Sequence, residues 1–255
     1  MAACVIYNLS IGVVDGLLWG MLVSLTGNSV SRNQIVVNPV ETDEFDSSKL
    51  GMQWQWQNDY KESYGQATSM GFFRLFTYAL PELGDVSNLW YVPNMLLQKI
   101  PADEFTATTK LSFCSRNSDQ YVGLVCMSAE YSSVGLQRTE DGYELQIRHN
   151  PNAMRTHLTD EVLTVDTLKP TQKGTPRKGR PAEMHIKDVY LRMSIKDSKV
   201  NYAYSIDGKK WKKAGGEYAM GKGRWIGSKI GFFAVDPNKT GRKGFIDIDW
   251  FRISR

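Results

Sequence analysis

From residue 39 onward, the sequence predicts an all-β sandwich of two antiparallel sheets. Three observations lead to this prediction: apolar and polar residues alternate in short runs, turn residues separate the runs at roughly 8–12-residue intervals, and helical periodicity is almost missing. The composition is 42% hydrophobic and 23% charged, which is ordinary for a globular protein and excludes wholesale disorder. With 255 residues, the chain is long enough to bury a full hydrophobic core.

The expected strands follow these runs in order. Residues 72–76 come after a glycine, 105–113 are rich in β-branched and aromatic residues, and 121–127 form an apolar run as short as a buried strand. A turn at 140–142 introduces the next strand, and 196–199 have the composition of a hairpin turn. The remaining expected strands are 143–147, 189–195, 200–206, 230–235 and 245–253.

Residues 1–38 differ from the sandwich that we expect at 39–255. Residues 3–25 are mostly apolar, but no Lys or Arg precedes Arg32, so the positive start of a secretory signal is missing. Asp15 and three glycines interrupt the run of about 20 apolar residues that a membrane span needs. Three interpretations stay open: an atypical signal or anchor, a packed remnant of an upstream domain followed by a linker at 26–34, or an artefact of the gene boundary.

Charge does not indicate a nucleic-acid partner or a membrane. The net charge is only +4, with −5 in residues 1–127 and +9 in residues 128–255. The basic stretch 169–180 holds five cations without aromatic residues, and four lysines surround Trp211 at an expected hairpin tip. We interpret both as solvated surface.

Cysteines and histidines show no metal-binding spacing. No CxxC or HxxxH pair is present, so we expect neither a disulfide framework nor a zinc enzyme, and we interpret the cysteines as buried free thiols. The residues concerned are Cys4, Cys114, Cys126, His149, His157 and His185.

Motifs for nucleophilic or phosphate chemistry are missing from the sequence: GxSxG, P-loop and GxGxxG do not occur. The nearest pattern is Glu41, Asp43 and Asp46, which resembles the ExDxxE strand of laminarinase-type sandwich glucanases. Alternation along a strand would put such carboxylates on one face, as nucleophile and general acid. A sandwich-fold glycoside hydrolase is therefore one alternative, although the third residue is Asp and the segment lies at the entrance to the domain.

A second carboxylate pattern suggests a structural calcium ion. Asp247 and Asp249 share one strand face, where two like charges are costly without a cation. Because the terminal strands of a sandwich often pair, we expect Glu44 or Asp46 to approach them. Calcium takes six to eight oxygen ligands, so these four residues are the candidate Ca²⁺ ligands. The alternative is that they face solvent or bind loop amides.

Residues 53–58 alternate indole and amide side chains. This pattern places Trp54 and Trp56 on one strand face. Indole faces stack on the C–H surfaces of sugars, and amides hydrogen-bond hydroxyls in pairs, so the strip suits a neutral carbohydrate. Packing in the core is the alternative. Trp90 and Trp225 are further candidates.

Several segments, in order, resemble the C-terminal β-sandwich of family 43 glycoside hydrolases, the β-xylosidases and α-L-arabinofuranosidases. The resemblance covers about residues 39–255 and ends in DIDWFR, similar to that family's terminal strand. The segments that carry it are LGMQWQWQ (50–57), NMLLQK (94–99), YVGL (121–124), YSIDG (204–208) with Trp211, IGFFA (230–234) and DIDWFR (247–252).

The resemblance implies a concanavalin A-like jelly roll, classed as carbohydrate-binding module family 91, with xylan or xylo-oligosaccharide as ligand. It also implies a partner, the five-bladed propeller that carries the three catalytic carboxylates, which have no counterpart in this sequence. In some relatives the segment that corresponds to 225–229 presents an aromatic residue to the active site, but here it ends in Lys229. The expected sugar contacts are Trp54, Trp56, Asn58, Trp90, Asn94 and Gln98.

The main hypothesis is therefore a non-catalytic, xylan-binding accessory module, truncated or split from its propeller. A purely structural domain that docks a separate propeller is an alternative to it. Because xylan lies outside the cell, we expect an extracellular or periplasmic location ahead of a cytoplasmic one, although many relatives cleave imported oligosaccharides inside the cell.

Overall fold

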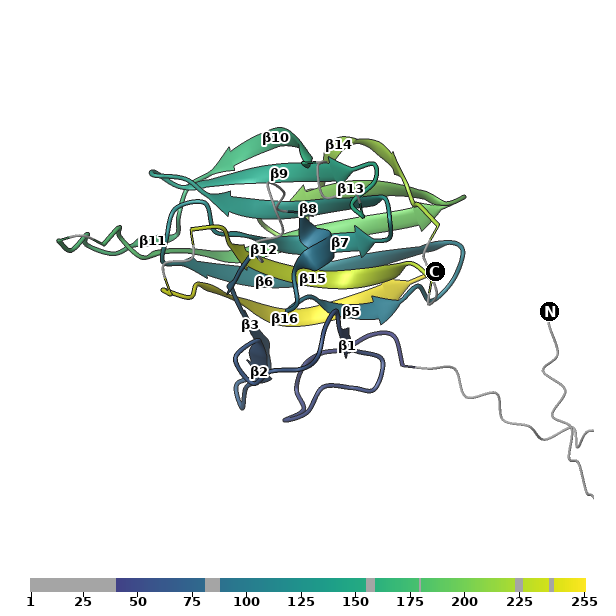
Figure 1. Ribbon diagram of the computed structural model, residues 1–255, viewed down its shortest axis with the longest axis horizontal. Helices are drawn as coiled ribbons and strands as arrows, with labels where there is room; N and C mark the ends of the chain where they lie inside the picture. Colours follow the sequence, from purple (N-terminus) through teal and green to yellow (C-terminus); the bar gives the residue numbers. More distant parts are fainter. Residues whose placement is uncertain (1–39, 81–87, 155–158, 179, 223–226, 239–240) are drawn as a thin grey trace, which may run out of the picture. The chain divides into compact units, whose positions relative to one another are not determined.

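The computed structural model describes residues 40–80, 88–154, 159–178, 180–222, 227–238 and 241–255 (Figure 1). The expected N-terminal segment 1–38, Cys4, His157 and Trp225 lie outside the described residues. The division of the chain at residues 38 and 39 stays a prediction. Within the described part, no helix is long and apolar enough to cross a membrane.

Two antiparallel sheets form the domain, which confirms the predicted all-β sandwich (Figure 1). Sheet I has the order β1-β5-β15-β7-β8-β9-β10, and β4 pairs with β15 in parallel. Its strands are β1 (Gln55–Trp56), β4 (Tyr78–Ala79), β5 (Leu96–Lys99), β7 (Tyr121–Met127), β8 (Tyr131–Arg138), β9 (Tyr143–Asn150), β10 (Glu161–Leu168) and β15 (Lys229–Asp236).

Sheet II has the order β14-β13-β12-β6-β16-β3-β2, and β11 pairs with β12. A short 3-10 helix, η1 (Leu89–Tyr91), precedes β5. The strands of sheet II are β2 (Gly65–Ala67), β3 (Phe73–Phe76), β6 (Phe105–Ser115), β11 (Gln172–Lys173), β12 (Met184–Lys196), β13 (Lys199–Ser205), β14 (Lys212–Ala219) and β16 (Phe245–Ser254).

Each strand predicted from alternation is present, and the hairpin at 196–199 is confirmed. Lys196 pairs with Lys199, and the two residues between them, Asp197 and Ser198, have φ values of 50° and 57°. Positive φ at both central positions is typical of a tight hairpin turn. The basic stretch 169–180 contains β11, which protrudes in Figure 1, and its described residues are exposed apart from Pro170.

The main core lies between the sheets. Alternate residues of β6, such as Leu111 and Phe113, meet alternate residues of β7, such as Val122 and Leu124, and all are at most 1% exposed. The intervening residues of β7 face the other side of sheet I, where Tyr121 and others pack with η1 in a second apolar cluster. Burial on both faces explains why 121–127 is apolar throughout.

The segment that enters the domain pairs with the end of β16. Asp43 and Phe251 exchange backbone hydrogen bonds of 2.8 and 2.7 Å, beyond the point at which β3 stops pairing with β16. The expected pairing of the terminal segments is thus observed. It places Asp43 beside the end of β16, where Trp54, the residue before β1, donates a hydrogen bond to it.

Candidate functional site

An open hollow lies beside β1, β2 and β3, where Trp56 meets Tyr60. Their ring centroids are 5.7 Å apart with an interplanar angle of 35°. Tyr60 is 58% exposed, which is unusual for a large aromatic side chain. The hollow has a volume of about 340 Å³. It is lined by Ser48, Lys49, Leu50, Trp56, Tyr60, Gly65, Gln66, Ala67 and Phe73.

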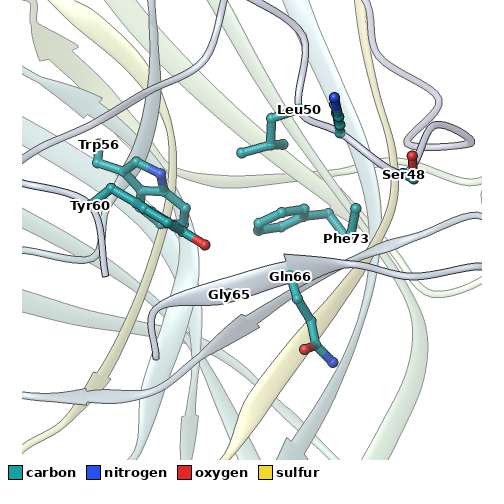
Figure 2. A pocket seen from close by; sticks show the side chains of 9 residues that line it. Ser48, Leu50, Trp56, Tyr60, Gly65, Gln66 and Phe73 are labelled. Carbon is teal, nitrogen blue, oxygen red and sulfur yellow. The ribbon is translucent and has the colours of Figure 1, made fainter. Parts of the chain in front are cut away.

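The side chains around the hollow divide into an aromatic wall and a polar rim. Figure 2 shows Trp56 and Tyr60 on one side, with Leu50 and Phe73 facing them. Phe73 is buried, and its ring centroid lies 6.2 Å from that of Trp56, so the hollow borders directly on the core. Exposed polar residues stand at the edge, among them Gln66 and Lys49.

The strand alternation at β1 sets the direction of these side chains. Trp56 pairs with Leu96 of β5, and the next residue, Gln57, turns away from the hollow. Gln57 donates a 3.3 Å hydrogen bond from Nε2 to the carbonyl of Trp90, and Lys229 donates from Nζ to Gln57 Oε1 at 2.8 Å. Lys229 is only 8% exposed, and burial lowers the pKa of its ammonium group.

Of the six expected sugar contacts, Trp56 lines the hollow. Asn58 is exposed and Trp90 is half-buried in η1, so both also reach the surface. Trp54, Asn94 and Gln98 are 8%, 0% and 2% exposed, so the structure does not gather the six residues on one exposed face.

These three buried residues hold the fold together. Asn94 Nδ2 donates to the carbonyls of Phe76 and Ala234 at 2.7 and 3.0 Å. Gln98 Nε2 donates to the carbonyl of Glu41 at 3.1 Å. The contacts observed for Asn94 and Gln98 are therefore internal, and Trp54 lies in the main core, which is the alternative that the sequence left open for the tryptophans.

Sequence reasoning missed Tyr60 and Gln66. Tyr60 lies in a loop without periodicity, and Gln66 lies in a strand of only three residues. Besides Trp56 itself, the signal in the sequence that points to this hollow is the aromatic residue four positions later.

The four candidate calcium ligands do not form one cluster. Asp247 accepts two hydrogen bonds from Arg74, at 2.7 and 2.8 Å, and Asp249 accepts from Lys110 at 2.9 Å. Glu44 accepts two from Arg252, each 2.8 Å, and these hydrogen bonds lower the pKa of Glu44. Asp46 is exposed.

Neighbouring strands thus supply cations for the like charges on β16. The hydrogen bond from Arg74 to Asp247 raises the pKa of the guanidinium, and the one from Lys110 to Asp249 raises the pKa of the ammonium group. The ion pairs account for the charge balance that suggested calcium. The calcium site stays a prediction.

The carboxylates of the glucanase-like pattern have structural partners. Asp43 accepts from Trp54 Nε1 at 2.7 Å through one oxygen and from the amide of Phe45 at 2.9 Å through the other. Glu41 pairs with Arg255 at 2.5 Å. In this geometry the segment closes the sandwich, and its carboxylates do not converge on the hollow.

The fold defines the class of protein: an all-β, concanavalin A-like sandwich built from two antiparallel sheets. The particular family follows from a direct match. Residues 42–254 match the model of the beta xylosidase C-terminal concanavalin A-like domain of GH43, and the chain belongs to this family.

Two curated relatives are β-xylosidases by name. The beta-xylosidase of Formosa agariphila is 26% identical over 234 residues, which is 85% of this chain and 35% of that protein. A putative beta-xylosidase of Xylanibacter ruminicola is 27% identical over 183 residues, or 71% and 28% of the two chains. The chain therefore spans about a third of the length of the curated relatives it matches.

Solved structures share the fold. A xylan beta-1,4-xylosidase from Bacillus halodurans is 18% identical with a TM-score of 0.64, covering 85% of this chain and 39% of that one. A bifunctional GH43-CE protein from Bacteroides eggerthii is 19% identical with a TM-score of 0.66, covering 86% and 26%. At these identities the likeness concerns the fold alone.

Proposed function

We propose that this domain is a non-catalytic accessory module that binds xylan or xylo-oligosaccharide at the hollow of Trp56 and Tyr60. The observation that carries the proposal is the aromatic pair on an open surface, with Tyr60 58% exposed and Trp56 in contact with the buried ring of Phe73. Indole and phenol rings offer flat apolar faces to sugar C–H groups, while exposed amide and hydroxyl groups at the rim serve the sugar hydroxyls.

Membership in the family supports the proposed ligand and partner. Curated relatives that contain this domain are named β-xylosidases, and about two thirds of their length lies beyond the match. We propose that the domain works beside a family 43 propeller catalytic domain, which would carry the catalytic carboxylates. Binding at the hollow would then hold the polymer near that domain.

The test is affinity electrophoresis of the full chain in gels with and without soluble arabinoxylan. We expect retardation by arabinoxylan and none by an unrelated glucan. Tyr60→Ala is the first variant, because its exposed side chain contributes little to the core. Trp56→Ala should abolish retardation as well, provided that circular dichroism shows an intact fold.

Trp211→Ala is the matched control. This tryptophan lies at the tip of the β13–β14 hairpin, where Arg192 covers its ring at 3.6 Å, and it does not line the hollow. Retardation that survives both substitutions at the hollow, or that is lost in Trp211→Ala, would contradict the assignment. No retardation of the unmodified chain would favour a domain that only docks its propeller.

A further inference from the structure

Three side chains with metal-binding chemistry meet on the outer face of sheet II, and the proposed sugar site does not use them. Cys114 lies on β6, His185 on β12, and Glu183 two residues before His185. In the register of the two strands Cys114 lies directly opposite His185. Their neighbours Phe113 and Met184 point into the core, so alternation turns all three side chains outward.

The three potential ligand atoms converge on one point. His185 Nε2 is 3.4 Å from Cys114 Sγ and 2.9 Å from Glu183 Oε1, and all three atoms lie within 4.8 Å of one another. With Zn–S near 2.3 Å and Zn–N near 2.0 Å, tetrahedral coordination separates sulfur and nitrogen by about 3.5 Å. The observed distance of 3.4 Å between Cys114 Sγ and His185 Nε2 is close to this value without an ion present.

We propose that Cys114, Glu183 and His185 form a binding site for Zn²⁺, with a water molecule completing a tetrahedral shell. A thiolate and a carboxylate would neutralise the two charges of the ion, and a neutral imidazole is the third ligand. Cys114 is 2% exposed, whereas the side chains of His185 and Glu183 are 29% and 39% exposed. The ion would therefore approach from the side of the imidazole and the carboxylate.

The same geometry does not fit a nucleophilic cysteine. In a catalytic triad the base binds the nucleophile through one ring nitrogen and the orienting carboxylate through the other. Here the same nitrogen of His185, Nε2, faces both Cys114 and Glu183, so the carboxylate does not orient the imidazole through Nδ1 as a triad requires. Burial and the neighbouring Glu183 also raise the pKa of Cys114 to about 12, so the thiol holds its proton at neutral pH unless a metal displaces it.

Arg116 supports the carboxylate from the second oxygen. Its Nε donates to Glu183 Oε2 at 2.8 Å, which leaves Oε1 directed at His185. A carboxylate ligand that is itself hydrogen-bonded is the usual arrangement around protein-bound zinc. One oxygen can thus take the ion while the other keeps its ion pair.

The test uses the full chain, untagged and freed of metal, titrated with Co²⁺ as a spectroscopic substitute for Zn²⁺. We expect one equivalent to bind with a thiolate-to-cobalt charge-transfer band, and added Zn²⁺ to remove the band. Cys114→Ser should lose the band. His185→Gln should weaken binding by more than the roughly 10–100-fold that loss of an outer-shell partner costs.

Cys126→Ser is the matched control. Cys126 is also buried with its pKa raised to about 12, but burial alone causes that shift. This variant should keep both the band and the stoichiometry. No charge-transfer band in the unmodified chain, or a band that survives Cys114→Ser, would overturn the proposal. Because the side chain of His185 is partly exposed, His185→Gln tests the site even if Cys114→Ser does not fold.

Discussion

Trp54 is the residue at which the core and the surface interpretations of the tryptophan strip differ most. It is 8% exposed and packs against three aromatic rings, those of Phe45, Phe232 and Phe251, at centroid distances of 5.6, 5.9 and 5.3 Å. Its Nε1 also donates to Asp43, the residue through which the entering segment joins β16. We therefore expect Trp54 to be one of the main stabilising residues of the domain.

The expected magnitudes follow from what each substitution removes. Trp54→Phe keeps most of the buried ring but loses the 2.7 Å hydrogen bond to a carboxylate, and such a bond contributes about 1.5–3 kcal/mol. Gln53 and the amide of Phe45 still donate to Asp43, so we expect a loss near the lower end, about 1.5 kcal/mol. Trp54→Ala also leaves a cavity in the core where the ring packs, and it should lower the free energy of unfolding by about 3–5 kcal/mol.

The assay is urea unfolding of the full chain at neutral pH, followed by circular dichroism because the substitutions change the fluorescence. Trp211→Phe serves as control and should stay within about 0.5 kcal/mol of the unmodified chain. If Trp54→Phe matches that control and Trp54→Ala costs less than about 2 kcal/mol, the core assignment is wrong. Trp54 would then again be a candidate for a sugar contact at the surface.

Three other predictions concern charge. Burial raises the pKa of Tyr121 and Tyr143 above the usual value near 10, so the stability that they contribute is complete below about pH 10 and is lost as pH rises through the raised values. The urea concentration at the unfolding midpoint should therefore decrease once the pH exceeds about 10. A midpoint that stays constant up to about pH 11 would contradict this. Hydrogen bonds from the backbone amides of Lys210 and Lys209 hold the pKa of Asp207 at about 2. An NMR titration of its carboxyl carbon should therefore have its midpoint near pH 2, and the stability that the ionised carboxylate contributes should be lost as the pH falls toward that value. An ordinary titration midpoint near pH 4 would refute the hydrogen bonds. If the four predicted ligands bind calcium, Ca²⁺ added to chelator-treated protein at 100 times its Kd should stabilise the fold by about 2.7 kcal/mol. The observed ion pairs instead predict that the melting temperature does not change. An unchanged melting temperature would rule out the calcium site.

The sequence predicts the central strands because their periodicity reflects burial directly. Residues 105–113 alternate and 121–127 do not, and the structure gives the physical reason: β6 has its apolar side chains on one face, whereas β7 is buried on both. Strands β10 and β14 lie at sheet edges and are mostly exposed, so burial imposes no alternation of apolar and polar residues on them, and β10 even has Val162 and Leu163 exposed. β8 is buried but rich in Ser and Gly, so its sequence does not stand out.

Local pattern also limits what can be inferred about sites. Alternation correctly places Trp54 and Trp56 on the same side of their segment, but it does not tell which of them the core covers. Contacts between distant strands are harder still. Cys114 and His185 lie 71 residues apart and meet only through the register of β6 and β12, so a search for metal-binding spacing along the chain misses them.

The position of β16 in sheet II has a consequence for how the domain is made during translation. β16 lies between β6 and β3, and the residues that it joins are distant: Arg74 and Asp247 are 173 residues apart. Until the ribosome has delivered residues 245–254, β2 and β3 have no sheet to join, and one edge of β6 is open. The nascent domain therefore exposes unpaired strand edges until late in synthesis, which is the period when aggregation competes with folding.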